Sequence, residues 1–178
     1  EEGIVAVGCD LSVERLLVAY QSGIFPWYSD GEPIIWHAPE ERFILELDEL
    51  HISRSMRRVL NSQKYLVTFD INFSFVIKQC ASVARKEQEG TWITNEMIDA
   101  YTALHESGYA HSVEVWQEDE IVGGLYGVSL GKIFFAESMF HTASNASKVA
   151  LIKLVEFLKQ KDFHFIDAQV HTAHVESL

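Results

Sequence analysis

The chain has 178 residues, enough for one well-buried domain or for a large domain with a small one. Its formal net charge is −12, from 26 acidic and 14 basic residues. This argues against extensive phosphate-backbone binding and leaves room only for a local basic patch. No apolar run approaches the ~18 residues of a membrane span, and Cys9 and Cys80 form no CxxC pair, so a reducing cytosol is expected.

The beginning of the chain predicts a small α/β head. Ser12 is a candidate N-cap for a helix whose apolar residues recur at helical spacing until Gly23 ends it. A loop punctuated by Pro and Gly follows, in which Phe25 is expected in the core and Trp27 is a candidate stacking surface. The segment IIWHA then has the composition of a short strand.

The next segment predicts strand, helix, strand and helix. RFILEL alternates like a strand, and Ser53 is placed to cap the short helix RSMRRVL. Three arginines within five residues are usually a solvated face, but on an acidic chain they are the best local anion footprint. YLVTFD reads as a strand, and Asn72 is placed to cap the helix FSFVIKQCASVARK.

The second half predicts a helix, an antiparallel meander, a helix and a final strand. Thr94 is the candidate N-cap of NEMIDAYTALHES. Three strands follow, and glycines inside the middle one indicate a bulge or a close approach of another group. Ser144 or Asn145 caps the long helix before FIDAQV. This order predicts an α+β fold and matches N-acyltransferase folds, an analogy that assigns no chemistry.

Two neighbouring apolar strands each carry an acidic residue. Glu137 interrupts KIFFAESMF, and period-2 geometry places Asp167 and Gln169 on one face of FIDAQV. Unpaired polar groups cost free energy when buried, so their presence there indicates a site. The competing interpretation is structural, because polar residues in strands often cap a helix or satisfy a loop.

Several stretches together resemble the bacterial leucyl/phenylalanyl-tRNA–protein transferases: GIFPWYSDGEPIIW, LHISRSMRR, EGTWIT, HSVEVWQEDEIVGGLYGV, FFAESMF, NASK and FIDAQV. They occur in the family's order from Val7 to Leu178. The resemblance implies a small N-terminal domain over residues 1–42. It implies an acyltransferase-like domain over residues 43–178, with a mixed, mainly antiparallel sheet flanked by helices. The family pattern continues beyond Leu178, so a C-terminal part is expected to be missing.

The resemblance also implies an activity. The enzyme would move Leu, or less often Phe or Met, from aminoacyl-tRNA onto the N-terminal Arg or Lys of an acceptor protein, which marks that protein for degradation. It would act in the cytoplasm as a monomer, with no membrane contact. No cofactor or covalent intermediate is expected, because the aminoacyl ester is already activated and the sequence shows no Ser/His/Asp or Cys/His arrangement.

The catalytic residues implied by the resemblance are Asp167, Gln169 and Glu137. Aminolysis of an ester needs a neutral amine, a stabilised oxyanion and a protonated leaving hydroxyl. Our hypothesis is that Asp167 polarises Gln169, whose side-chain carbonyl accepts a hydrogen from the incoming amine. Glu137 would hold the acceptor's cationic end or the terminal ribose.

The resemblance maps a pocket for the aminoacyl side chain onto residues that any core would also use. An unbranched methionine lets one pocket take Leu, Phe or Met. Strict alternation puts Phe134 and Met139 on opposite faces, so both line one pocket only with a bulge or an open strand edge. The complete set is Leu125, Phe134, Met139, Leu151, Leu154, Leu158 and Ile166.

The tRNA is expected to be held mainly at its single-stranded 3′ end by aromatic stacking, which an acidic protein tolerates better than duplex binding. The stacking candidates are Trp27, Trp92 and Tyr101. The candidates for phosphate contacts in the acceptor stem are Arg54, Arg57, Arg58 and Lys64.

Three other interpretations remain open. An acyl-CoA-dependent N-acetyltransferase normally needs a Gly-rich turn for the pyrophosphate, and HTASNASK contains no glycine. A metal site would draw on His171 and His174, but two histidines near a chain end are more often surface residues, and no metal is expected. A non-catalytic binder of tRNA or of N-terminal peptides would share the aromatic pocket without needing Asp167 with Gln169.

Overall fold

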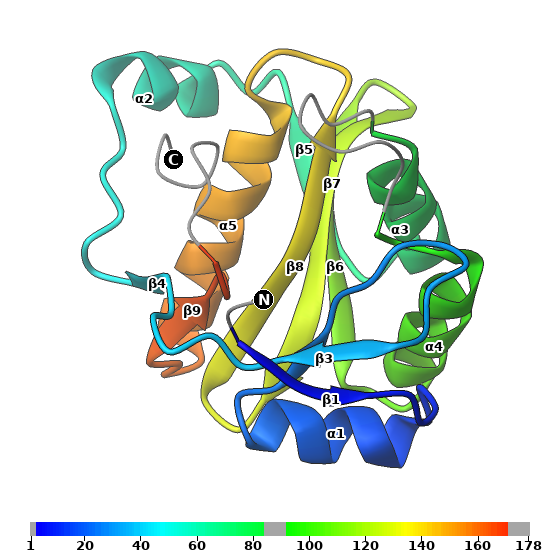
Figure 1. The fold of residues 1–178 in the computed structure, drawn as a ribbon. Coiled ribbons are helices and arrows are strands. Elements are labelled where there is room, and N and C mark those ends of the chain that lie inside the picture. The colour runs from blue at the N-terminus through cyan, green and yellow to red at the C-terminus, as the bar shows by residue number, and fades with distance from the viewer. Residues whose placement is uncertain (1–2, 84–91, 171–178) are drawn as a thin grey trace.

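The fold comes from a computed structural model that describes residues 3–83 and 92–170 (Figure 1). The helices are α1 Val13–Gln21, α2 Arg54–Asn61, α3 Phe73–Ser82, α4 Asn95–Glu106 and α5 Ala146–Gln160. The strands are β1 Ile4–Val7, β2 Phe25–Pro26, β3 Ile35–His37, β4 Ile44–Glu46, β5 Leu66–Phe69, β6 Ala110–Gln117, β7 Glu120–Leu130, β8 Ile133–His141 and β9 Phe165–Asp167.

Two sheets organise these elements. A small antiparallel sheet has the order β1-β3-β2, and a larger sheet has the order β4-β9-β8-β7-β6-β5. Every pairing in the larger sheet is antiparallel except that of β8 with β9. Helix α5 covers one face of this sheet, and α3 and α4 cover the other (Figure 1). The α+β class, with a small N-terminal sheet and a mixed, mainly antiparallel second sheet, is confirmed.

The helix starts follow the predicted caps in three cases. The side chains of Ser53, Asn72 and Thr94 each accept a hydrogen bond from a backbone amide in the first turn of α2, α3 and α4. Ser12 and Asn145 occupy the N-cap positions of α1 and α5, but neither side chain makes a capping hydrogen bond. The capping role predicted for these two positions is therefore wrong, although the helices begin where expected.

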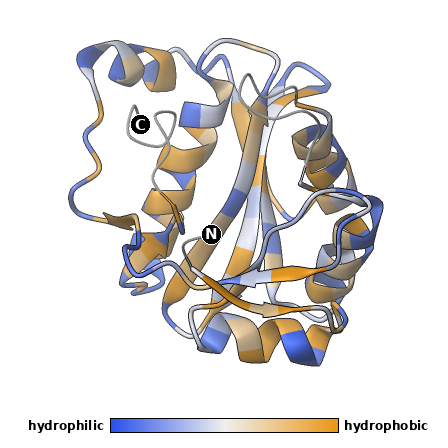
Figure 2. Cartoon of the chain, in the orientation of Figure 1, coloured by the Kyte–Doolittle hydropathy of each residue, from blue (hydrophilic) through white to orange (hydrophobic). Residues whose placement is uncertain are grey.

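Apolar side chains form two clusters, one on each face of the larger sheet. One cluster joins the small sheet, α1, α3 and α4 to the sheet, and the other lies between the sheet and α5, with α2 beside it. Figure 2 shows β8 as a mostly hydrophobic strand with a hydrophilic break part-way along it. Strand β8 therefore separates two apolar layers and carries a polar group between them.

A β-bulge lies at that break. Tyr126 of β7 pairs with Ser138, and Gly127 pairs with Ala136, so Glu137 has no opposite residue. The extra residue shifts the alternation, so that Phe134 and Met139 both join the α5 cluster. This is the bulge that a shared pocket requires. A side chain at Gly127 would collide with the carbonyl oxygen of Phe135 and with the ring of Phe134, so only glycine fits beside the bulge.

The last strand is shorter than predicted. Strand β9 ends at Asp167, and Gln169 adopts a φ of 64°, in the left-handed region. The amide of Val170 donates to the carbonyl of Ala168 at 2.7 Å, which closes a tight bend around Gln169. The prediction of strand geometry through Gln169 and Val170 is therefore wrong. The predicted end of the helix FSFVIKQCASVARK and the turn at Gly90 lie outside the described residues.

Candidate active site

Glu137 is the centre of a hydrogen-bonded group on the α1 and α4 side of the sheet. Its Oε1 accepts from the Tyr20 hydroxyl at 2.6 Å and from Nε2 of Gln169 at 2.8 Å. Its Oε2 lies 3.4 Å from the hydroxyl of Tyr101, which also hydrogen-bonds to Tyr20. Both tyrosine side chains are buried, one on α1 and one on α4. The bulge is what directs the carboxylate toward them.

The environment of Glu137 shifts its protonation into the neutral pH range. Burial is the largest cause and raises the pKa of Glu137 to about 7, and the negative charge of Asp167 acts in the same direction. Hydrogen bonds from Tyr20, Gln169 and Tyr101 oppose this shift because they stabilise the carboxylate. Burial, followed by the charge of Glu137, raises the pKa of both tyrosines. The tyrosines are therefore neutral donors, and Glu137 can gain or lose a proton near pH 7.

Asp167 has fixed partners on both carboxylate oxygens. Oδ2 accepts from a terminal nitrogen of the Arg42 guanidinium at 2.6 Å, and Oδ1 accepts from the backbone amide of Gln169 at 2.7 Å. The side chain of Asp167 is 9% exposed. Asp167 thus contacts Gln169 through the backbone rather than through the side-chain amide, so the hypothesis that Asp167 polarises that amide directly is wrong.

Gln169 connects the two acids. Its backbone amide binds Asp167, while its side-chain nitrogen donates to Glu137. Among the described residues, no donor reaches the side-chain oxygen of Gln169. The structure therefore brings the three predicted catalytic residues together, through the left-handed bend at Gln169 instead of the predicted strand alternation. Within the part of the chain that the structure describes, the side-chain oxygen of Gln169 is thus an acceptor that another group can use.

The seven residues predicted for the aminoacyl pocket gather in one place. Six of them belong to the buried cluster between the sheet and α5, and Met139 packs against it. They come from β7, β8, α5 and β9. The packing of this cluster shows that they are neighbours, and it leaves their role in binding an amino acid as a prediction.

The three predicted stacking residues differ in what they offer. Trp27 is partly buried at the end of β2, with its ring 5.6 Å from that of His37. Trp92 is 9% exposed and Tyr101 is fully buried, with its ring against the edge of Tyr126. In this structure Tyr101 presents no free ring face for stacking, and its hydroxyl is the part that reaches the site.

Comparison with known proteins identifies the group to which this arrangement belongs. A family model described as leucyl/phenylalanyl-tRNA protein transferase matches residues 44–178, and a model of the N-terminal domain of the same proteins matches residues 10–40. The chain belongs to the leucyl/phenylalanyl-tRNA protein transferase family. The family and the enzyme class predicted from the sequence are confirmed.

Individual relatives agree over almost the whole chain. The leucyl/phenylalanyl-tRNA–protein transferase of Syntrophus aciditrophicus is 59% identical over all 178 residues, which cover 74% of that protein. The transferase of Flavobacterium johnsoniae is 54% identical, again over 100% of this chain and 84% of its own length. The solved structure of L-PGS from Bacillus licheniformis aligns with 90% of this chain and 51% of its own, at a TM-score of 0.51 and 14% identity. That structure shows a shared fold.

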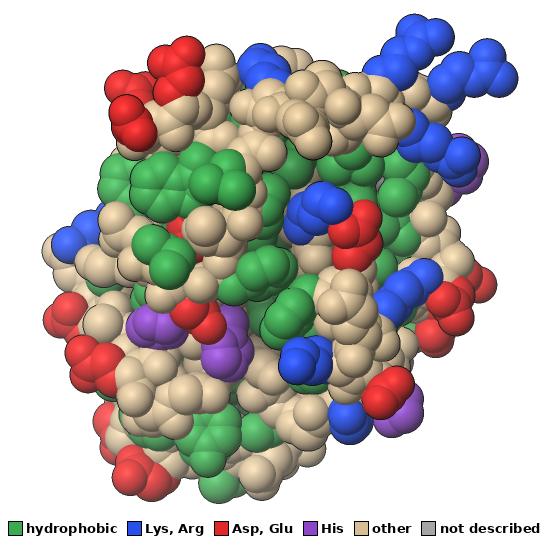
Figure 3. All heavy atoms as spheres, turned by 180° about the vertical axis from the view of Figure 1, so that it is seen from behind, with side chains coloured by type: hydrophobic (Ala, Val, Ile, Leu, Met, Phe, Trp, Pro, Cys, Tyr) green, Lys and Arg blue, Asp and Glu red, His purple; other side chains and the backbone are tan. Residues whose placement is uncertain are grey.

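The basic residues predicted to contact phosphates of the tRNA lie on or just after α2, and none of them belongs to the hydrogen-bonded group around Glu137. Arg54, Arg57 and Arg58 are exposed on α2, and Lys64 is exposed just beyond it, above the ring of Tyr65. Seen from behind, Lys and Arg side chains project from the upper corner where α2 lies (Figure 3). Met56, the one buried residue of α2, packs into the α5 cluster. The basic residues are therefore exposed on a helix that is anchored to the protein by this side chain.

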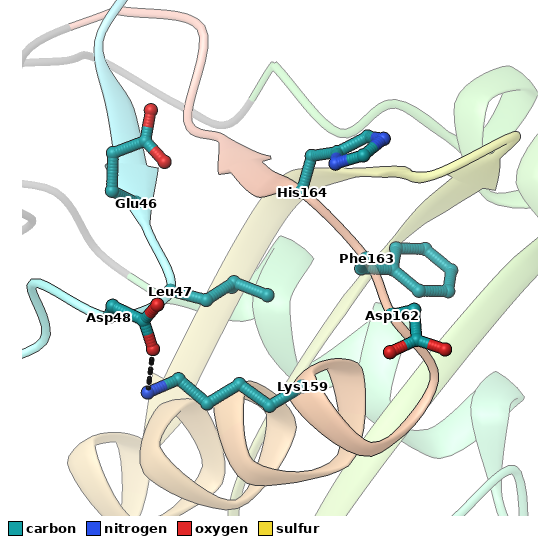
Figure 4. A pocket seen from close by; sticks show the side chains of 7 residues that line it. All are labelled: Glu46, Leu47, Asp48, Lys159, Asp162, Phe163 and His164. Carbon is teal, nitrogen blue, oxygen red and sulfur yellow. Dashed lines mark ion pairs between the residues drawn. The ribbon is translucent and has the colours of Figure 1, made fainter.

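An open hollow on the surface contains none of the predicted site residues. It has a volume of about 420 Å³ and is lined by residues of β4 and of the segment from α5 to β9 (Figure 4). An ion pair of 2.8 Å joins Lys159 to Asp48 at its rim. The part of the chain that the structure describes has no group of three metal-ligating side chains and no helix able to cross a membrane. His171 and His174 lie outside the described residues.

Sequence reasoning missed two residues of this site. Tyr20 lies among the apolar residues of the first predicted helix, and its hydroxyl reaches Glu137 across 117 positions of sequence. Arg42 opens the segment RFILEL, which is predicted only as a strand, and it binds Asp167 across 125 positions. Tyr20 precedes the motif GIFPW and Arg42 follows the motif IIW, but neither residue is part of the motif. Only the packing of the N-terminal part of the chain against β8 and β9 brings them to Glu137 and Asp167.

Proposed function

We propose that this chain transfers leucine, and also phenylalanine or methionine, from aminoacyl-tRNA to the N-terminal Arg or Lys of acceptor proteins, which marks them for degradation. Membership of the transferase family supports this activity. The single structural observation that carries it is the contact between Nε2 of Gln169 and Glu137, beside Asp167. This contact supplies a carboxylate and an amide side by side, which are the kinds of group that can accept a proton and orient an amine in aminolysis.

The reaction forms one amide bond and breaks one ester bond. The amine nitrogen of the acceptor attacks the ester carbonyl carbon, and the bond to the ribose oxygen of the terminal adenosine breaks. The amine loses a proton and the departing ribose hydroxyl gains one. A free α-amino group has a pKa of about 8, so only a modest bias toward the neutral amine is needed.

Glu137 and Gln169 divide the work on the amine. The side-chain oxygen of Gln169 accepts a hydrogen from the amine and orients its lone pair. Glu137, with a pKa of about 7, takes the proton, because its ionised form is available near neutral pH. Asp167 holds the backbone of Gln169 in place. Glu137 therefore has a more direct role than the sequence hypothesis gave it, in addition to any contact with the acceptor's cationic side chain or the ribose.

The specificity for the transferred residue is assigned to the α5 cluster. The unbranched side chain of Met139 adapts to Leu, Phe or Met, whereas a β-branched substrate is stiffer and crowds the pocket. Opening this pocket requires side chains of the cluster to move, because they pack against one another in this structure. The pocket residues are the seven predicted from the sequence: Leu125, Phe134, Met139, Leu151, Leu154, Leu158 and Ile166.

The tRNA is assigned to two surfaces. Trp27, with Trp92 beside the same core, stacks on bases of the single-stranded 3′ end, and Tyr101 contributes its hydroxyl to Glu137. The basic residues of α2 and Lys64 contact phosphates of the acceptor stem. The enzyme is proposed to be a cytoplasmic monomer that needs no cofactor, with its domains divided at residue 42.

A transfer assay tests this function. Radiolabelled leucyl-tRNA is mixed with the protein and with a model substrate carrying N-terminal Arg, or Gly as a control. We expect label to enter only the Arg substrate, and Asp167→Ala and Gln169→Ala to lower the rate about 100-fold or more. Asp119→Ala and Gln160→Ala, on exposed positions, serve as matched controls. Near-normal transfer by folded Asp167→Ala and Gln169→Ala proteins would contradict the assignment, and absence of transfer with tRNA binding retained would favour a non-catalytic binder.

A further inference from the structure

Arg42 lies in the connection between the small sheet and β4. It falls in residues 41–43, between the two stretches matched by the family models. The next residue fixes its backbone beside the site, because the carbonyl of Phe43 accepts from the amide of Ala168 at 2.9 Å. The amide of Phe43 in turn lies 3.4 Å from the carbonyl of Gln169. The antiparallel pairing of β4 with β9 thus carries Arg42 alongside Asp167.

The guanidinium of Arg42 contacts three separate groups. One terminal nitrogen lies 2.6 Å from Oδ2 of Asp167, and the other donates to the carbonyl oxygen of Gly23 at 3.1 Å. The central carbon of the guanidinium lies 5.1 Å from the centre of the Phe25 ring. The planar fork of an arginine can hold two oxygen acceptors and an aromatic face at once. Arg42 is therefore fixed at both terminal nitrogens and at its face.

Burial separates this ion pair from an ordinary surface pair. The side chains of Arg42 and Asp167 are 21% and 9% exposed, whereas those of Arg15 and Asp10 on the surface are 45% and 61% exposed. An exposed pair contributes little because water competes for both charges. Removal of one partner from a shielded pair leaves the other charge without compensation. The orientation of Asp167 consequently depends on Arg42.

Asp167 in turn holds a strained backbone. Gln169 has a positive φ, which costs free energy for a residue with a side chain and persists only where neighbouring groups enforce it. The hydrogen bond from its amide to Oδ1 of Asp167 is one such enforcement. The side-chain nitrogen of Gln169 reaches Glu137 only from this bend. A chain of contacts therefore runs from Arg42 through Asp167 and Gln169 to Glu137.

We propose that Arg42 is a positioning residue for the transfer reaction. It touches neither substrate. It holds Asp167 in the orientation that locks the Gln169 bend, and so places the amide of Gln169 and the carboxylate of Glu137 for the incoming amine. This role rests on the proposed function. Gly23 and Phe25, both in the small N-terminal domain, hold the guanidinium in place. The N-terminal domain would in this way help to position the catalytic residues of the second domain.

The test measures kcat and KM for Arg42→Ala and Arg42→Lys, with Arg15→Ala as the matched control. We expect kcat to fall about 100-fold in Arg42→Ala, because a displacement of about 1 Å at a catalytic group has that effect. KM for both substrates should stay within about threefold, since ground-state contacts are unchanged. Arg42→Lys should recover little activity, because an ammonium cannot hold Asp167 and Gly23 in the same geometry. Arg15→Ala should match the wild type.

Two further measurements separate positioning from a general loss of fold. Millimolar guanidinium chloride, far below denaturing concentration, should restore part of kcat to Arg42→Ala but none to Asp167→Ala. The double variant Arg42→Ala with Asp167→Ala should be no slower than Asp167→Ala alone, because the two residues act as one unit. An unchanged kcat in folded Arg42→Ala, an absence of rescue or additive losses would each overturn the proposal.

A readout without activity distinguishes failure of this proposal from failure of the proposed function. The side-chain amide signals of Gln169 in an NMR spectrum should shift in folded Arg42→Lys protein and stay unchanged in Arg15→Ala. If the wild-type protein transfers no leucine, the proposed function fails while this shift still supports the positioning role. If the wild type is active and the Gln169 signals do not move in Arg42→Lys, the positioning role is overturned.

Discussion

Two acidic residues of the larger sheet, Glu114 and Glu137, differ in their burial and in the donors that bind their carboxylates. Glu114 on β6 is fully buried and accepts hydrogen bonds from the hydroxyls of Thr68 and Ser112 and from the backbone amides of Ile71 and Asn72. Glu137 on β8 is only partly buried and accepts from three side chains, with the charge of a second acid nearby. Glu114 holds the turn between β5 and α3 in place. Glu137 is the centre of the candidate active site.

The difference lies in how the donors are supplied. The partners of Glu114 are fixed by the pairing of β5 with β6 and by the start of α3, so the carboxylate completes a local structure. The partners of Glu137 come from α1, from α4 and from the bend after β9, which only the tertiary fold brings together. A carboxylate that accepts hydrogen bonds from the strand and turn next to it has a structural role. A carboxylate on a bulge, with donors from separate elements of the fold, is available for chemistry.

The largest effect is expected from Glu137→Gln. The amide keeps an oxygen to accept from Tyr20 and Gln169 but cannot take a proton near pH 7. We expect kcat for transfer to fall about 10²–10⁴-fold, the usual contribution of a general base, with the fold retained. Single-turnover transfer from leucyl-tRNA measures this. Equal rates for Glu137→Gln and wild type would remove Glu137 from the chemistry.

The comparison predicts the reverse outcome for Glu114→Ala. Loss of this carboxylate leaves the buried hydroxyl of Ser112, the partly buried hydroxyl of Thr68 and two backbone amides without this acceptor. The free energy of unfolding should therefore fall by about 3 kcal/mol. Denaturant unfolding measures this loss, and kcat per folded molecule should remain that of the wild type. A stable but inactive Glu114→Ala protein would break the distinction between the two acids.

The pH dependence of stability offers a smaller effect with a defined sign. Glu137 has a pKa of about 7 in the folded state against a usual value of 4.5, so between these values the folded protein binds more protons than the unfolded chain. Its contribution to stability is complete below about pH 4.5 and is lost as the pH rises to about 7. After allowance for water near the group, the loss is about 1–2 kcal/mol.

Comparison of unfolding curves for wild type and Glu137→Gln at pH 5 and pH 8 isolates this contribution. The free energy of unfolding of Glu137→Gln, relative to that of the wild type, should be higher at pH 8 than at pH 5. A difference between the two proteins that is independent of pH would mean that Glu137 has an ordinary pKa, and would contradict the account of its environment.

The smallest effect is expected from the basic patch on α2. Charge reversal at Arg57 and Arg58 should weaken leucyl-tRNA binding and flatten its salt dependence, with the slope falling by about one for each phosphate that is no longer neutralised. The catalytic constant at saturation should not change. Lys78→Glu on α3, across the sheet from α2 (Figure 1), is the matched control. An unaltered salt slope would exclude this patch from the tRNA interface.

The sequence predicted local structure well where local chemistry decides it. Ser53, Asn72 and Thr94 cap their helices because a short polar side chain beside a first turn has one favourable partner. The meander and the last helix follow from periodicity and turn residues. Glu137 and Asp167 could be selected because acids interrupt apolar strands, and the motif resemblance supplied the family.

The rest of the site depends on tertiary packing that no local pattern carries. Gln169 reaches Glu137 from a left-handed bend, which strand alternation does not predict. Arg42 and Tyr20 join the site through packing of the small sheet and α1 against β8 and β9. Tyr101 lies in a helical apolar stripe, and only its position against Tyr20 and Glu137 distinguishes its hydroxyl from those of other buried tyrosines.

The role of Glu137 is tested most directly by the pH dependence of single-turnover transfer from leucyl-tRNA to a saturating substrate with N-terminal Arg, for wild type, Glu137→Gln and Glu114→Gln. We predict that the wild-type rate rises with pH through an inflection near 7, where Glu137 becomes ionised. Glu114→Gln should keep this inflection, and Glu137→Gln should lose it and retain only the later rise of the amine near about 8. The same inflection near 7 in Glu137→Gln would contradict the central role given to Glu137.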